Sequence, residues 1–270
     1  MKRLVLGVLF ATTFSCCSLE VQPWFGDLFQ FHLLTGYSYS RFDSVQRGVP
    51  QLRSPFNANL VQEGLEFCFL PEWSFDLDLQ VASTTKVPFY FRSSALQIRY
   101  LWLDDMVGDP FSLTTGFSTR FTPSRALSDI SCPSHANVDF ELNFSLGKEW
   151  DASQSWRWRL WFFGTVGHGN RGSPWVRGSL ATETNVNDQH YYGFYALGSN
   201  GYGRHTHVMI DHFRGYAKIR AKSIDLGAWY GHRMGVWGMF RAGYERRVLA
   251  KSYPKDVNTL TLSYSIPFSI

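Results

Sequence analysis

The chain has 270 residues, of which 44% are hydrophobic, 17% aromatic and 18% charged, and its formal net charge is +4. Disordered chains are rich in charge and poor in aromatic residues, so this composition excludes disorder. A hydrophobic content this ordinary also excludes a bundle of membrane-spanning helices, and no concentrated basic face suggests nucleic-acid binding. The high aromatic and low charged content requires a fold with much partly apolar surface.

The first 18 residues read as a targeting segment. Two basic residues precede an apolar run over 4–14, which is shorter than the ~20 residues needed to cross a bilayer. Small residues follow at 15–18, so the pattern predicts a secretory signal peptide over 1–18, cleaved after Ser18. The mature domain is then 19–270. An alternative is a lipoprotein in which Cys16 becomes the lipid-modified first residue.

Only two cysteines, Cys68 and Cys132, remain after cleavage. Their spacing matches neither a metal-binding pattern nor a disulfide framework. A single bridge in an oxidising compartment and two free thiols are both compatible with the sequence.

The rest of the chain alternates between apolar and polar residues. Over 138–146, for example, every second residue is apolar, and Asp139, Glu141, Asn143 and Ser145 lie between them. A period of two is typical of β-strands. The stretch 213–232 fits either one long irregular strand or two strands. The predicted strands, twelve with a range of ten to fourteen, are 28–42, 59–69, 73–83, 90–103, 111–121, 137–149, 156–168, 174–185, 189–199, 213–232, 236–247 and 258–270.

A soluble β-sandwich alternates in the same way, because one face of each sheet packs inward. The polar face of this chain, however, often carries small neutral residues such as Thr261, Ser263 and Ser265. Aromatic residues gather near strand ends, and long connections alternate with tight ones, as in outer-membrane barrels. The sequence therefore favours an all-β fold, a transmembrane antiparallel up-and-down β-barrel of twelve strands in one domain.

The last strand carries an apolar or aromatic residue at every second position up to the final residue. It resembles the assembly signal of bacterial outer-membrane β-barrel proteins of the porin-like class, here formed by Tyr264, Ile266, Phe268 and Ile270. That class most often ends in Phe, and this chain ends in Ile. The resemblance implies location in the bacterial outer membrane, with the lipid bilayer and the barrel-assembly machinery as partners.

If the apolar face meets lipid, the polar face lines the lumen, the interior of the barrel. We expect a passive pore for small solutes with a charged lumen, in the way that rings of charge select ions in other pores. The opposite charges could instead neutralise one another and plug a narrow barrel. The residues expected to line the lumen are Asp76, Asp78, Arg99, Asp139, Glu141, Arg157, Arg159, Lys218, Arg220, Lys222, Asp225, Arg241 and Glu245.

Three other functions fit parts of the sequence. The stretch around His168 faintly resembles the site of outer-membrane phospholipases, but Asn170 stands where the nucleophilic serine belongs, and Ser173 has the wrong parity. His205 and His207, with Asp211 and His212 nearby, could hold a metal or could be solvated loop residues. Surface recognition by the long loops is the third alternative. We assign no catalytic residue, metal ligand or cofactor, and no nucleic-acid partner.

Overall fold

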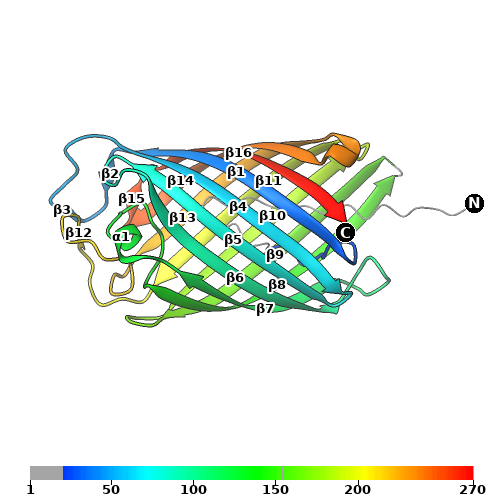
Figure 1. Ribbon diagram of the computed structural model, residues 1–270, viewed down its shortest axis with the longest axis horizontal. Coiled ribbons are helices and arrows are strands. Elements are labelled where there is room, and N and C mark those ends of the chain that lie inside the picture. The colour runs from blue at the N-terminus through cyan, green and yellow to red at the C-terminus, as the bar shows by residue number, and fades with distance from the viewer. Residues whose placement is uncertain (1–20, 154, 270) are drawn as a thin grey trace, which may run out of the picture.

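The computed structural model of the protein describes residues 21–153 and 155–269, and these form a closed β-barrel (Figure 1). Twelve antiparallel strands follow one another around the barrel, and the last pairs with the first. No helix in the described part of the chain is long and apolar enough to span a membrane. The barrel strands are β1 (Gln30–Phe42), β4 (Phe56–Leu70), β5 (Trp73–Thr84), β6 (Tyr90–Leu103), β7 (Ser112–Phe121), β8 (Val138–Ser153), β9 (Trp156–Gly169), β10 (Trp175–Val186), β11 (His190–Gly201), β13 (Lys222–Arg233), β14 (Met239–Lys251) and β16 (Asn258–Ser269).

The predicted twelve-stranded barrel is confirmed, and most predicted strands differ from the observed ones by a few residues at their ends. The prediction for 213–232 is wrong over its first part, since β13 begins at Lys222. Over 213–221 the backbone turns on itself: the Ile219 N–H donates to the Tyr216 carbonyl at 3.0 Å. The apolar side chains of this stretch alternate because they pack between loops, and no barrel strand forms there.

Side chains alternate between the two surfaces of the barrel wall, apart from local irregularities where the strand register shifts. On β8, Asp139 and Glu141 are 2% and 5% exposed, whereas Phe140 and Leu142 are 46% and 67% exposed. The outer wall is therefore apolar and the interior polar, the reverse of a soluble protein. Closure also pairs the backbone groups of both edge strands, which is what a sheet needs in order to sit in lipid.

The two rims of the barrel differ in their connections. The turn rim, where β1 begins and β16 ends, has connections as short as the two residues 71–72. Between β10 and β11, Asn187 and Asp188 have φ of 57° and 54°, as in the turns that match the twist of a hairpin. The opposite end, the loop rim, carries the three longest connections, 43–55, 122–137 and 202–221, and the shorter 252–257.

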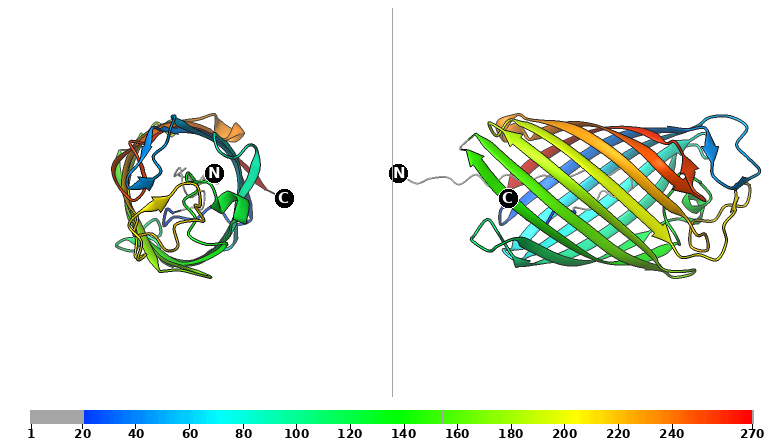
Figure 2. Two further views of the ribbon diagram at one scale, coloured as in Figure 1. Left: turned by 90° about the vertical axis from the view of Figure 1, so that its left-hand side faces the viewer. Right: turned by 180° about the vertical axis from the view of Figure 1, so that it is seen from behind.

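The connections of the loop rim fold over the end of the lumen. In the end-on view, this rim's loops and the short helix α1 (Ser124–Leu127) lie within the ring of strands (Figure 2). Two small sheets join the loops, one pairing β3 (Gly48–Val49) with β12 (Val208–Met209), the other β2 (Ser44–Val45) with β15 (Pro254–Lys255). Beneath them lies an apolar cluster made of Phe42, Val45, Phe56, Ala58, Ile130, Val208, Ile210, Phe213, Tyr216, Ile219 and Ala221. The loops thus form a compact cap.

The two cysteines of the barrel domain are both buried free thiols. Cys68 lies near the end of β4, at the turn rim, and Cys132 lies in the 122–137 loop of the opposite rim. Because the two lie at opposite ends of the barrel, the single-bridge alternative does not apply in this fold. The expected signal peptide and Cys16 lie outside the described residues.

The apolar outer wall predicts a position-dependent cost of placing a charge on it. Leu180, in the middle of β10 and 53% exposed on the outer surface, should face the hydrocarbon core. We expect Leu180→Lys to lower the free energy of unfolding by about 2–4 kcal/mol in lipid vesicles, the cost found at a bilayer midplane. Val176→Lys, on the same face nearer the loop rim, should cost clearly less. Equal costs at the two positions, measured by urea unfolding, would contradict a membrane-facing wall.

Candidate functional site: the barrel lumen

The segment that precedes β1 lies inside the lumen. Val21, Gln22 and Trp24 are 3%, 1% and 4% exposed, although nothing in their sequence places them in a core. The Arg99 guanidinium donates to the Gln22 carbonyl at 2.7 Å, and the Ser145 hydroxyl donates to the Val21 carbonyl at 2.7 Å. The segment over 21–27 therefore occupies the turn-rim half of the lumen and reaches about halfway along β8.

Trp24 is the main contact of this segment with the wall. Its ring meets that of Trp161 edge to face, with 6.0 Å between centroids, and the Arg159 guanidinium lies 4.7 Å from its centroid. On β8, Gly147 leaves the necessary space, because a Cβ there would lie 2.6 Å from the Pro23 side chain. Aromatic and cation–π contacts of this kind add to the gain from apolar burial.

Asp105, in the turn between β6 and β7, anchors the ring of Trp24. Its carboxylate accepts the Trp24 indole N–H at 2.8 Å, the Glu149 backbone N–H at 2.7 Å and the Ser112 hydroxyl at 2.5 Å, and Lys148 lies 3.6 Å away. Burial acts to raise the pKa of Asp105, but these hydrogen bonds and the Lys148 charge outweigh it and hold the pKa below its usual range. One carboxylate thus ties the segment to the β6–β7 turn and to β7 and β8.

Ion pairs between strands cover the inner wall. Arg99 on β6 lies 3.2 Å from Asp76 on β5 and 3.4 Å from Glu66 on β4. Further around the barrel, the closest ion-pair distances are 3.6 Å for Arg120–Asp78, 2.8 Å for Arg177–Glu141 and 2.6 Å for Arg247–Asp225, and Arg159 bonds Glu149. Charges buried this deeply are costly unless they are paired. Three of these pairs, Arg99–Glu66, Arg120–Asp78 and Arg177–Glu141, also link strands that are not adjacent in the wall.

The structure places nine of the thirteen expected residues in the buried inner wall: Asp76, Asp78, Arg99, Asp139, Glu141, Arg159, Asp225, Arg241 and Glu245. Arg157 points the same way but lies at the turn rim, where it bonds Asp188. Lys218, Arg220 and Lys222 do not join them. Lys218 and Arg220 are exposed in the 202–221 loop, and Lys222 is exposed on the outer face of β13. The alternation of these three residues with apolar ones arises in a loop and at the start of a strand, so it does not place them in the lumen.

Several wall residues were missing from the expectation. Glu66, Arg120, Arg177 and Arg247 are partners in the ion pairs, and each has the inward parity within a predicted strand, so the same pattern could have found them. Trp161 and Phe163 also face inward, where the segment over 21–27 covers them. The sequence gives no signal for that contact.

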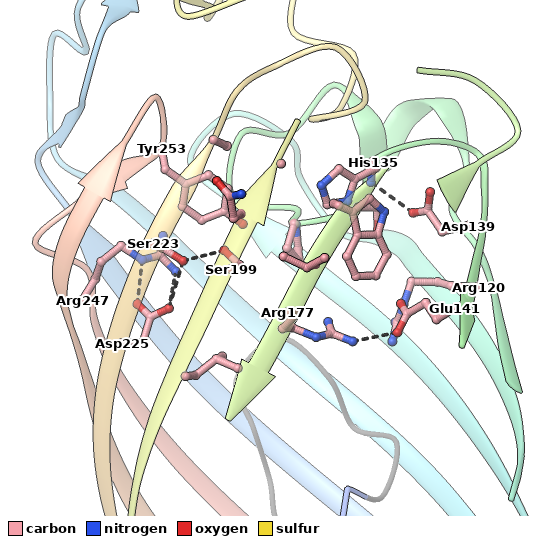
Figure 3. A pocket seen from close by; sticks show the side chains of 18 residues that line it. Arg120, His135, Asp139, Glu141, Arg177, Ser199, Ser223, Asp225, Arg247 and Tyr253 are labelled. Carbon is pink, nitrogen blue, oxygen red and sulfur yellow. Dashed lines mark hydrogen bonds and ion pairs between the residues drawn. The ribbon is translucent and has the colours of Figure 1, made fainter. Parts of the chain in front are cut away.

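A cavity of about 50 Å³ remains in the loop-rim half of the lumen (Figure 3). The arginines Arg120, Arg177 and Arg247 and the carboxylates of Asp139, Glu141 and Asp225 line it, so charges of both signs are equal in number there. Trp175 and Tyr253 add aromatic surface. The charged side chains of the cavity therefore balance, and they offer hydrogen-bonding groups to a small hydrophilic molecule beside a largely apolar lining.

His135 forms part of the cavity's roof. It belongs to the 122–137 loop, and its ring stacks on that of Trp175 with 4.7 Å between centroids. The Asp139 carboxylate accepts its backbone N–H at 3.0 Å, which ties the loop to β8. Burial, together with the nearby Arg177 charge, lowers the pKa of His135 to about 3. The imidazole is thus neutral at physiological pH and adds no charge to the cavity.

The residues of the other hypotheses lie apart from the lumen. His168 is exposed on the outer face of β9, and Asn170 and Ser173 lie in the following loop, where the Ser173 backbone N–H donates to the Ala217 carbonyl. His205, His207, Asp211 and His212 are exposed in the 202–221 loop. Within the described residues, no three His, Cys, Asp or Glu side chains are placed to hold a metal ion.

No family model and no curated protein matches the chain. Among solved structures, an outer membrane channel from Pseudomonas putida F1 superposes with a TM-score of 0.60 at 11% identity, over 90% of this chain and 96% of the channel. The chain has the fold of bacterial outer-membrane channels. The NanC porin superposes with a TM-score of 0.53 at 10% identity, over 87% of this chain and 98% of the porin. At these identities, the likeness concerns the fold alone.

The hydrogen bonds of Asp105 predict that its contribution to the stability of the folded protein depends on pH. Asp105→Ala removes the acceptor of three donors, and we expect it to cost about 1–3 kcal/mol of stability at pH 7. Because the folded-state pKa of Asp105 is depressed, its contribution is complete above the ordinary value of about 4 and disappears as the pH falls through the lowered value.

Urea unfolding of both forms between pH 7 and pH 2 measures this. The difference between wild type and variant should be constant near neutrality and shrink under acid conditions. A difference that instead grew on acidification would contradict the assigned hydrogen bonds.

Proposed function

We propose that the protein spans the bacterial outer membrane and conducts small hydrophilic solutes through its lumen. The observation that carries this proposal is the charged, nearly neutral inner wall around a cavity, inside a closed barrel whose outer wall is apolar. Two layers restrict the path: the loop cap at one rim and the segment over 21–27 at the other. We therefore expect a narrow pore, in keeping with a wall of twelve strands.

Location and assembly belong to the same proposal. The named proteins of similar fold are outer-membrane channels and porins. We infer that residues 1–18 direct export and are removed. The outward face of β16, which includes Tyr264, Ile266 and Phe268, would be the signal read by the barrel-assembly machinery, with Ile270 outside the described residues.

Planar-bilayer recording tests the pore and the role of the segment over 21–27. Wild-type protein should give small discrete conductance steps, and deleting 21–25 should raise the conductance roughly twofold or more, because the constriction is removed. The deletion variant must still migrate faster unboiled than boiled on a gel, which shows an intact barrel. No current from intact wild-type barrel would exclude a pore, and unchanged conductance after deletion would exclude the segment as the constriction.

The cavity's charge balance predicts weak ion selectivity that single substitutions can bias in either direction. Glu141→Gln removes the carboxylate 2.8 Å from Arg177, so the local charge becomes positive and the reversal potential in a KCl gradient should shift toward anion selectivity. Arg177→Gln should shift it toward cations, and the double variant should return to the wild-type value. Shifts of the same sign in both single variants would show that this pair does not border the ion path.

A further inference from the structure

The loop rim carries a second, larger recess outside the lumen. It has a volume of about 590 Å³ and is lined by the 202–221 loop together with Arg171 from the loop between β9 and β10. Four permanent cations border it, namely Arg171, Arg204, Arg214 and Lys218, with three histidines among them. No acidic residue is present in the described lining. The recess is therefore strongly positive.

These four cations differ from the arginines of the lumen. Arg177 and Arg247 in the lumen each bond a carboxylate. Within 21–153 and 155–269, by contrast, the side chains of Arg171, Arg204, Arg214 and Lys218 make no ion pair and no hydrogen bond. Within the described part of the protein no carboxylate contacts these four side chains, and an anion in the recess would supply that missing contact.

The backbone beneath the cations is ordered by hydrogen bonds. Gly172 has φ of +96°, and a Cβ there would lie 2.4 Å from the Ala217 carbonyl oxygen, so a glycine is needed for the two loops to meet. The Ser173 N–H donates to the Ala217 carbonyl at 2.8 Å, and the His205 N–H donates to the Lys218 carbonyl at 2.9 Å. The cations are thus attached to a fixed frame, which lowers the entropy lost when a ligand is bound.

We propose that this recess binds a dissolved multivalent oxyanion, a molecule that carries several carboxylate, phosphate or sulfate groups. Guanidinium groups match the geometry of such oxygens. A single exposed ion pair contributes little, so several anionic groups on one molecule are needed for useful affinity. Lipid headgroups present the same chemistry, but the 202–221 loop extends beyond the barrel strands, away from the apolar wall (Figure 1). This placement favours a ligand that arrives from solution.

The recess adjoins the lumen cavity, but the proposed binding of an anion there does not require that the lumen conducts. The Ala217 backbone N–H, in the recess, donates at 3.1 Å to the carbonyl of His135, which lines the cavity. This hydrogen bond joins the linings of the two spaces. An anion held here would lie at the mouth of the barrel, whether or not the lumen opens.

Calorimetric titration of the full protein in neutral detergent micelles with tripolyphosphate tests the proposal. We expect saturable binding that weakens as salt is added. The triple variant Arg204→Gln, Arg214→Gln and Lys218→Gln should lower the association constant by roughly tenfold or more. The matched control is Arg53→Gln, Arg125→Gln and Lys255→Gln, three exposed cations on other loops of the same rim, which should change it by less than about twofold.

Three outcomes would overturn the proposal. One is absence of binding by the wild-type protein. Another is an equal loss in the two triple variants, which would indicate a general effect of rim charge. The third is recess-dependent binding of phosphatidylglycerol in mixed micelles without binding of tripolyphosphate, which would identify a lipid headgroup as the ligand. Retention of heat-modifiable mobility by each variant excludes misfolding as the cause.

Discussion

Pairing of the first barrel strand with the last is the constraint on which the rest of this structure depends. From Gln30 opposite Ser269 to Arg41 opposite Asn258, β1 and β16 run antiparallel along their length, and the sheet has no free edge. An open sheet of this length would expose rows of unpaired N–H and C=O groups, which neither lipid nor a dry interior could satisfy. Closure removes that cost and fixes which surface of every strand faces in.

Once the wall is closed, the inner and outer surfaces must meet opposite requirements. The outer surface can be apolar and aromatic without penalty. The lumen is too narrow for water to solvate every charge on the inner surface. The guanidinium of Arg99 is therefore shared between Glu66 and Asp76, and Arg247 pairs with Asp225. The same pairs join strands across the wall. The ion pairs between strands therefore both balance the charge of the lumen and stiffen the wall.

Much of the fold could be predicted because alternation reports directly on a wall with two different faces. The ion-paired residues of the lumen follow from the same parity. Two features of the structure could not be predicted from this alternation. Trp161 and Phe163 break the pattern on β9 because the N-terminal segment covers them from within, and no periodicity records a contact with an irregular segment. Lys218 and Arg220 alternate with apolar residues in a loop that is packed on one side, which imitates a strand.

The residue that links the lumen segment to the wall is Phe29. Its φ of 60° turns the chain out of the lumen at the turn rim, and its N–H donates to the Cys68 carbonyl at 2.9 Å, just before β1 begins. The interior segment is thus directly continuous with one of the two strands that form the closing seam. The segment that fills the turn-rim half of the lumen and the strand that closes the wall are thus directly connected parts of the chain. If β1 and β16 pair first, the segment over 21–27 must enter the lumen afterwards through the turn rim.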